Sequence, residues 1–117
     1  MPQSNIGRIF FTSSSSPAGP KQVGVGNFPA SGVKNILVKN VGLTMFAVRG
    51  RANAAATSPD ILLAPDHVGM VVLTGTSGQP AYVEFWKYFD PYYINMHNTS
   101  APVDERPGVA EIEAIQG

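Results

Sequence analysis

The sequence has 117 residues, of which 44% are hydrophobic and 14% are charged, with no cysteine and a formal net charge of zero. A chain of this length can bury a hydrophobic core as one domain, and without cysteine it forms neither disulfides nor thiolate metal sites. It contains neither a signal-peptide pattern nor the roughly 18 consecutive apolar residues of a membrane helix, so we expect a protein made in the cytoplasm without membrane contact.

The charges divide unevenly between the two halves of the chain. Residues 1–59 contain six basic residues and no acid, whereas residues 60–117 contain eight acids and two basic residues. Because the basic residues are scattered and opposed by the acids, we expect no nucleic-acid binding. Two interpretations remain open: ion pairs between strands of one domain, or contact between the basic half of one copy and the acidic half of another.

The first predicted element is a strand over residues 5–12. Alternation divides its side chains between two faces, with Ile6, Arg8 and Phe10 on one and Ile9 and Phe11 on the other. Residues 13–20, SSSSPAGP, predict a loop because proline cannot donate to a strand ladder. The glycine-bearing residues 21–32 predict an irregular edge strand.

Two pairs of apolar, β-branched segments predict hairpins. Residues 33–39 and 43–49 flank Asn40-Val41-Gly42, a sequence typical of a short turn between two strands. Residues 68–74 and 81–88 form the second pair, joined by a glycine- and proline-bearing loop. In the last of these strands one face carries Tyr82, Glu84, Trp86 and Tyr88, and the other carries Ala81, Val83, Phe85 and Lys87.

Turn-forming residues surround the remaining elements. Residues 50–59 predict a loop, and residues 60–63 predict a short strand that ends at an Ala-Pro-Asp turn. Residues 90–96 predict another short strand. Residues 109–115 alternate like a strand but are rich in alanine and glutamate, which also favour a helix, and we favour the strand.

Seven or eight short strands without a helical period predict an all-β fold. We expect a single antiparallel β-sandwich, of jelly-roll or immunoglobulin-like type, with extended N- and C-terminal arms. The predicted organisation has an N-terminal strand and flexible arm at residues 1–20, a sandwich core at residues 21–96, and a C-terminal loop and tail at residues 97–117.

Few residues suggest catalysis or metal binding. His67 and His97, with Asp66 and Asp90, are the conceivable metal ligands, but lone histidines beside turns are usually surface residues. Glu84 and Asp90 are the conceivable acid–base pair, although so short a chain leaves little room for a catalytic cleft. We therefore expect no catalytic residue, no metal and no cofactor.

Aromatic residues are concentrated near the C-terminal third, where residues 82–93 hold seven of the eleven. We expect Phe85 in the core. For Trp86, Tyr88, Tyr92 and Tyr93 two functions remain open, a protein interface or a platform on which sugars stack, and we favour the interface.

Four segments together follow a pattern of turns. They are ILVKNVG at residues 36–42, MFAVRG at 45–50, AAATSPDILLAP at 54–65 and VVLTG at 71–75. A strand ends in an Asn-x-Gly turn, its partner ends near a glycine, a loop of small residues leads to Asp and a Leu-x-Pro turn, and another strand follows. Over about residues 33–88 this pattern resembles small β-sandwich virion proteins of tailed bacteriophages, of the head decoration or cement type.

The resemblance implies a structural protein without catalysis. We expect a capsid decoration protein on the virion surface that bridges and stabilises neighbouring copies of the major capsid protein, and that forms a homo-oligomer, a trimer by preference. Residues 5–12 and 109–115 are predicted contact arms. The expected interface residues are Phe10, Phe11, Trp86, Tyr88, Tyr92, Tyr93 and Ile112.

Two other classes remain as alternatives. A carbohydrate-binding module or host-recognition component of a phage tail would stack sugars on Trp86, Tyr88 and Tyr92. A small hydrolytic enzyme would use Glu84 and Asp90.

Overall fold

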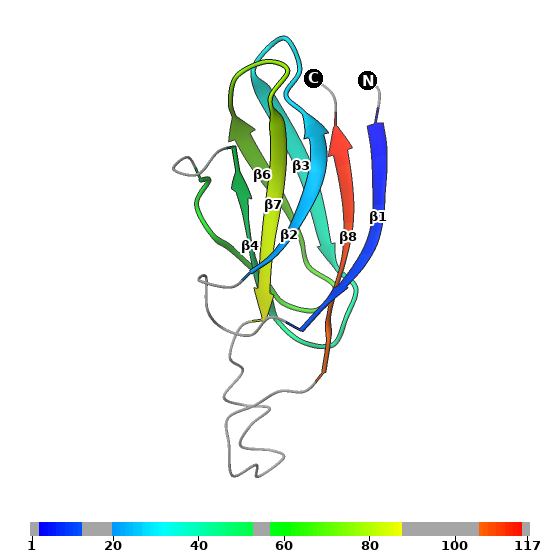
Figure 1. The fold of residues 1–117 in the computed structure, drawn as a ribbon. Helices are drawn as coiled ribbons and strands as arrows, with labels where there is room; N and C mark the ends of the chain where they lie inside the picture. The colour runs from blue at the N-terminus through cyan, green and yellow to red at the C-terminus, as the bar shows by residue number, and fades with distance from the viewer. Residues whose placement is uncertain (1–2, 13–19, 53–56, 88–105, 116–117) are drawn as a thin grey trace.

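The computed structural model describes residues 3–12, 20–52, 57–87 and 106–115, which form eight strands in two packed antiparallel sheets (Figure 1). Sheet A has the order β1-β8-β3-β6, and sheet B has the order β2-β7-β4-β5. The strands are β1 (Gln3–Phe11), β2 (Lys21–Asn27), β3 (Val33–Asn40), β4 (Phe46–Arg51), β5 (Ile61–Leu63), β6 (Val68–Thr74), β7 (Pro80–Lys87) and β8 (Gly108–Ile115). The predicted all-β sandwich is confirmed.

The strand pairing is that of a long hairpin rolled into a sandwich. β1 pairs with β8, β2 with β7, β3 with β6 and β4 with β5, all antiparallel. The ladders β3–β8 and β4–β7 then join these pairs into the two sheets. Eight strands in this order make a jelly roll, which selects one of the two predicted sandwich types.

Both predicted hairpins are wrong, because each supposed pair of strands lies in two different sheets. β3 belongs to sheet A and β4 to sheet B, and β6 and β7 are separated in the same way. The buried Asn40 stabilises the connection between β3 and β4, where the chain passes from sheet A to sheet B. Its Nδ2 donates to the carbonyl oxygens of Thr44 at 2.9 Å and Leu63 at 2.8 Å. Its Oδ1 accepts from the backbone N–H of Gly42 at 3.0 Å. The Asn-Val-Gly sequence therefore turns the chain from one sheet to the other.

A β-bulge changes which face of β1 each side chain occupies. The register with β8 shifts between Asn5 and Gly7, and Gly7 has a φ of 107°, which favours glycine. Ile6 consequently packs against the core with Ile9, whereas Arg8 and Phe10 point outward. The predicted grouping of Ile6 with Arg8 and Phe10 is wrong because strict alternation does not continue through a bulge.

The core lies between the sheets and includes three aromatic rings in mutual contact. Phe11 of sheet A meets Phe46 and Phe85 of sheet B, with ring centroids 5.3 and 5.4 Å apart, and the latter two rings are 5.5 Å apart. Gly108 makes room for this cluster, since a Cβ there would lie 2.3 Å from the ring of Phe11. The aliphatic part of the core includes Ile36, Val38, Val48, Val71, Val83 and Ile112.

The strands predicted as terminal contact arms are integral parts of sheet A. β1 pairs along its length with β8, and β8 lies between β1 and β3 (Figure 1). β8 is a strand, as favoured from the sequence, and its Ala110, Ile112 and Ala114 are fully buried. Residues 13–19, the predicted strand at 90–96 and the adjoining loop to residue 105 lie outside the described residues.

Candidate interaction surfaces

The outward face of sheet A exposes a row of apolar side chains along β6. Val68, Met70 and Val72 keep 52%, 40% and 55% of their surface exposed, and we call these three residues the β6 strip. Val71 and Leu73, which alternate with them, point into the core and are buried. At the opposite edge of the same sheet, Phe10 of β1 is 63% exposed. The face thus presents apolar groups at both edges.

Charged side chains from β1, β8 and β3 lie on the same face. Arg8 of β1 forms an ion pair with Glu111 of β8, with Nη2 and Oε2 2.8 Å apart, and Lys39 of β3 lies opposite Glu111 in the neighbouring ladder. A shallow hollow of about 100 Å³ lies beside this row and is lined by Leu37, Lys39, Val68, Glu111 and Glu113. Apolar and charged groups of both signs therefore meet on one surface.

The outward face of sheet B is built differently, around a carboxylate held by two arginines. Glu84 of β7 is 5% exposed. Its Oε1 lies 2.7 Å from Nε of Arg49, and its Oε2 lies 2.9 Å from Nε of Arg51. The guanidinium of Arg49 also lies over the ring of Trp86, 5.1 Å from the ring centroid, in a cation–π contact. This cluster is shielded from solvent and already supplies its own partners.

The ion pairs bear on the uneven division of charge between the two halves of the chain. The ion pairs of Arg8 with Glu111 and of Arg49 and Arg51 with Glu84 each join a basic residue of the first half to an acid of the second. Strand pairing brings the two halves together, since β1 meets β8 and β4 meets β7. For Arg8, Arg49 and Arg51, pairing within one domain is therefore confirmed.

The predicted interface residues fall into four groups. Phe10 is exposed and available for contact. Phe11 and Ile112 are core residues, 4% and 0% exposed, and their assignment to an interface is corrected because both side chains pack into the core between the two sheets. Trp86 is only 4% exposed beneath Arg49. Tyr88, Tyr92 and Tyr93 lie outside the described residues.

The residues considered for catalysis do not form a site among the described part of the chain. Glu84 is buried between its two arginines, and its proposed companion Asp90 lies outside the described residues, as does His97. Within the described ranges no group of three or more His, Asp or Glu side chains could hold a metal ion. These residues contain no helix long and apolar enough to cross a membrane.

A buried lysine was not singled out from the sequence. Lys34 points into the sandwich from β3 and is fully buried, and its Nζ donates to the carbonyl oxygen of Asn27 at 3.2 Å. Burial lowers the pKa of Lys34 from 10.5, because desolvation disfavours the ammonium form. The sequence pattern that could have indicated its burial is the alternation along β3, because Lys34 shares the inward face of this strand with Ile36 and Val38.

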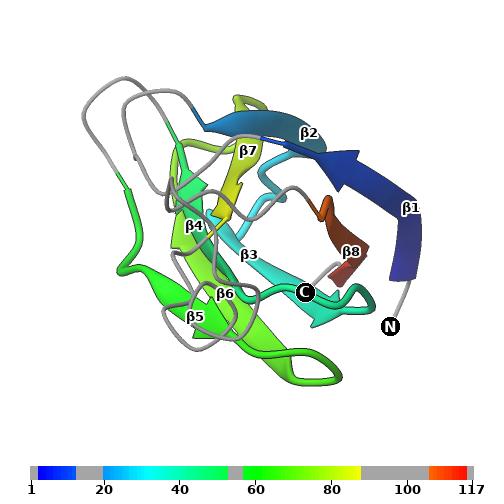
Figure 2. The ribbon, with the colours of Figure 1, turned by 90° about the horizontal axis from the view of Figure 1, so that it is seen from below.

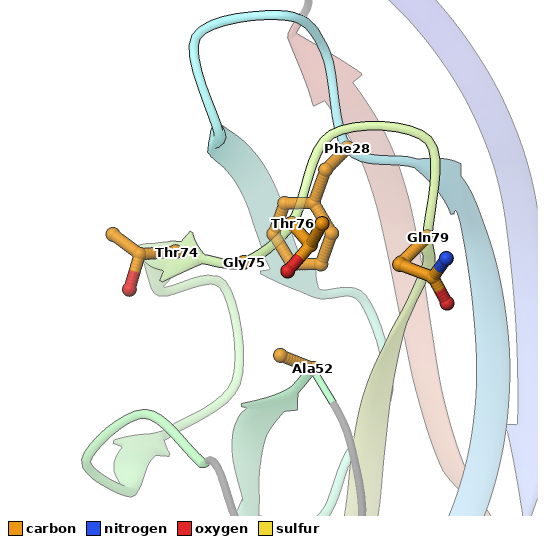
Figure 3. Close-up of a pocket in the computed structure, with 6 residues that line it drawn as sticks. All are labelled: Phe28, Ala52, Thr74, Gly75, Thr76 and Gln79. Carbon is orange, nitrogen blue, oxygen red and sulfur yellow. The ribbon is translucent and has the colours of Figure 1, made fainter.

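An open pocket of about 410 Å³ lies at one end of the sandwich, lined by Phe28, Ala52, Thr74, Gly75, Thr76 and Gln79 (Figure 3). The ring of Phe28 fills the space beside Gly75, where a Cβ would lie 2.4 Å from the ring. In Figure 3 the polar ends of Thr74 and Gln79 point away from each other. Among the described residues that line this pocket none is charged.

No protein-family model matches the chain, and no curated protein matches it. Among solved structures, the chain is similar to one described as Bacillus endospore appendages that form a family of disulfide-linked pili. The TM-score is 0.47 and the identity is 8%, with 98% of this chain and 88% of that chain covered. A likeness at this level carries no information about function.

Proposed function

We propose that the chain is a structural protein that binds neighbouring protein subunits through the outward face of sheet A. The observation that carries this proposal is the exposure of Phe10 and the β6 strip on the outward face of sheet A, away from the core between the sheets. Exposed apolar groups that gather on one surface are typical of protein-binding sites. The charged residues between them supply the polar contacts that accompany such interfaces.

In its specific form, the proposal is a capsid decoration protein of a tailed bacteriophage. The turn pattern over residues 33–88 supports it, and jelly rolls are frequent among viral capsid domains. Each copy would contact two adjacent capsid subunits and bind the assembled shell in preference to free subunits. Such binding stabilises the shell by mass action, without any chemical step.

The structure changes the part of the chain expected to make the contact. Because β1 and β8 are paired strands, bridging by detached terminal arms is replaced by contact with the face that they help to build. Of the residues first predicted on these strands, Phe10 remains a contact residue. Removal of residues 1–20 would delete β1 and expose the core, so it cannot separate binding from folding.

A binding experiment with matched variants tests the proposal. The purified chain is mixed with capsids that lack it, and the bound fraction is measured after sedimentation. We expect the Phe10→Asp variant to bind about tenfold more weakly, a loss of about 1.4 kcal/mol, because the contact would desolvate a carboxylate that has no partner there.

Leu62→Asp is the matched control, since Leu62 is 50% exposed but points outward from sheet B. It should bind like the unmodified chain. Absence of binding by the unmodified chain would contradict the capsid proposal. Weaker binding by Leu62→Asp alone would move the contact surface to sheet B.

A further inference from the structure

The four edge strands of the sandwich differ in how they are protected against pairing with another chain. β1 and β6 border sheet A, whereas β2 and β5 border sheet B. β1 carries the bulge at Gly7 and the exposed Arg8, and β2 carries Lys21 and a break in register between Gly24 and Asn27. β5 has only three residues. Bulges, charged side chains and short length are recognised protections of sheet edges.

β6 has none of these protections. It runs for seven residues, VGMVVLT, without proline, without a charged residue and without a shift in its register with β3. Figure 2 shows β6 beside β5 at one side of the sandwich, with β1 on the other side. Among the described strands β6 pairs only with β3, and we call its second edge, which none of the described strands occupies, the open edge.

The hydrogen bonds that flank the β3–β6 ladder define which residues of β6 face the open edge. The N–H of Asn40 donates to the carbonyl of His67, and the N–H of Gly75 donates to the carbonyl of Gly32, both at 2.9 Å. In an antiparallel ladder, hydrogen-bonded residue pairs alternate with non-bonded pairs. Residues 67, 69, 71, 73 and 75 therefore bond toward β3. The backbone groups of Val68, Met70, Val72 and Thr74 point to the open edge.

We propose that the open edge of β6 pairs antiparallel with β6 of a second copy of this chain. A register centred on Val71 places Val68 opposite Thr74 of the second copy and Met70 opposite Val72 of the second copy. Each of the four edge-facing residues then meets another edge-facing residue. All eight of their N–H and C=O groups on each chain find a partner, so this strand is complementary to itself.

The side chains support the same register. On the outward face, Met70 and Val72 form two apolar cross-strand pairs related by symmetry, which reduces the exposed area of the β6 strip. No charged residue of β6 opposes its own copy. The contact has a two-fold axis and closes as a dimer, in place of the trimer expected from the sequence. Its test is separate from that of capsid binding, because it needs only the purified chain.

Amide hydrogen exchange followed residue by residue in solution, alongside light-scattering mass, tests this pairing. In dilute solution we expect the amides of residues 69, 71 and 73 to exchange slowly and those of Met70 and Val72 to exchange fast. At high concentration the mass should rise from 12.4 kDa to twice that value. The amides of Met70 and Val72 should then slow by at least about tenfold, since hydrogen bonding protects them.

Val72→Pro is the decisive variant, because it removes an N–H that points to the open edge and leaves the ladder to β3 intact. It should remain folded by circular dichroism and stay at 12.4 kDa at every concentration. Met70→Lys should also remain folded and monomeric, because a charged side chain on an edge strand opposes pairing with another copy while the backbone is unchanged.

Phe10→Asp is the matched control on the other edge of sheet A and should dimerise normally while binding capsids about tenfold more weakly. The proposal is overturned if the mass stays at 12.4 kDa with fast exchange of Met70 and Val72 at the highest soluble concentration. It is equally overturned if Val72→Pro and Met70→Lys both fold and still dimerise. Failure of capsid binding, with these exchange results intact, would remove the proposed function alone.

Discussion

The outward faces of the two sheets place similar ion pairs in very different surroundings. On sheet A, the side chains of Arg8 and Glu111 are 55% and 45% exposed, and apolar groups lie open at both edges. On sheet B, the side chain of Glu84 is 7% exposed, its two arginines are 16% and 21% exposed, and Trp86 is buried with them. Water screens the first pair much more strongly than the second. The difference indicates that sheet B is stabilised by its polar cluster, whereas sheet A is available for contact.

The largest loss in the free energy of unfolding is expected for a substitution in the core between the two sheets. Phe11→Ala should lower the free energy of unfolding by about 3–5 kcal/mol, because it opens a cavity beside Phe46 and Phe85. Phe10→Ala, at the next position but on the outward face, should change it by less than about 0.5 kcal/mol. Urea unfolding of the two variants measures both values. Equal losses would contradict the assigned faces of β1.

The largest difference between the outward faces is expected at Glu84. Glu84→Gln leaves two arginines without their shared carboxylate in shielded surroundings. We expect a loss of about 2–3 kcal/mol in urea unfolding, somewhat below the range for fully buried pairs because the arginines keep some solvent. A change below about 0.5 kcal/mol would show that the cluster contributes little to stability.

The buried Lys34 adds a pH dependence to the stability of the fold. Its folded-state pKa lies below the unfolded value of 10.5, so in this window the unfolded chain binds more protons. Stability should therefore rise with pH from the lowered pKa up to about 10.5, where the penalty for burying the charge has disappeared.

Urea unfolding at a series of alkaline pH values measures this slope. Lys34→Met should flatten it, because the variant has no ammonium group to desolvate. Lys39→Met is the matched control on the exposed face of the same strand and should keep the slope. An unchanged slope in Lys34→Met would assign the pH dependence to other groups.

The smallest effect is expected at the exposed pair of sheet A. Glu111→Gln should lower the free energy of unfolding by at most about 1 kcal/mol at low salt, because water already solvates both partners. The loss should shrink further at high salt, where exposed charges are screened. A loss as large as that of Glu84→Gln would remove the proposed contrast between the two faces.

Sequence reasoning located the strands well and their partners poorly. The apolar alternation at residues 109–115 and the turn at Pro65 predicted β8 and the end of β5 from local chemistry. The two hairpins failed because an Asn-x-Gly turn has the same local signature whether the next strand pairs with its neighbour or crosses to the other sheet. In this protein the crossing depends on bonds from Asn40 to Thr44 and to Leu63, the latter 23 positions further along the chain.

Which residues of the candidate surfaces are exposed could likewise not be predicted from the local sequence. Burial of Phe11, Ile112 and Trp86 depends on which sheet or side chain lies above them, and alternation alone does not contain that information. The exposure of the β6 strip depends on β6 being the last strand of sheet A, a consequence of the complete strand order. The bulge at Gly7 likewise reversed the face of Ile6 through pairing with a strand about a hundred residues away.

By itself, the sequence determined the fold class, the strand positions and the absence of disulfide chemistry, because periodicity, turn residues and composition act locally. Only the tertiary structure decided the jelly-roll order, the pairing of the basic half with the acidic half, and the unprotected edge at β6. Those features arise when segments distant in the chain compete for the same partners. The free energy that selects among them comes from burying one common core.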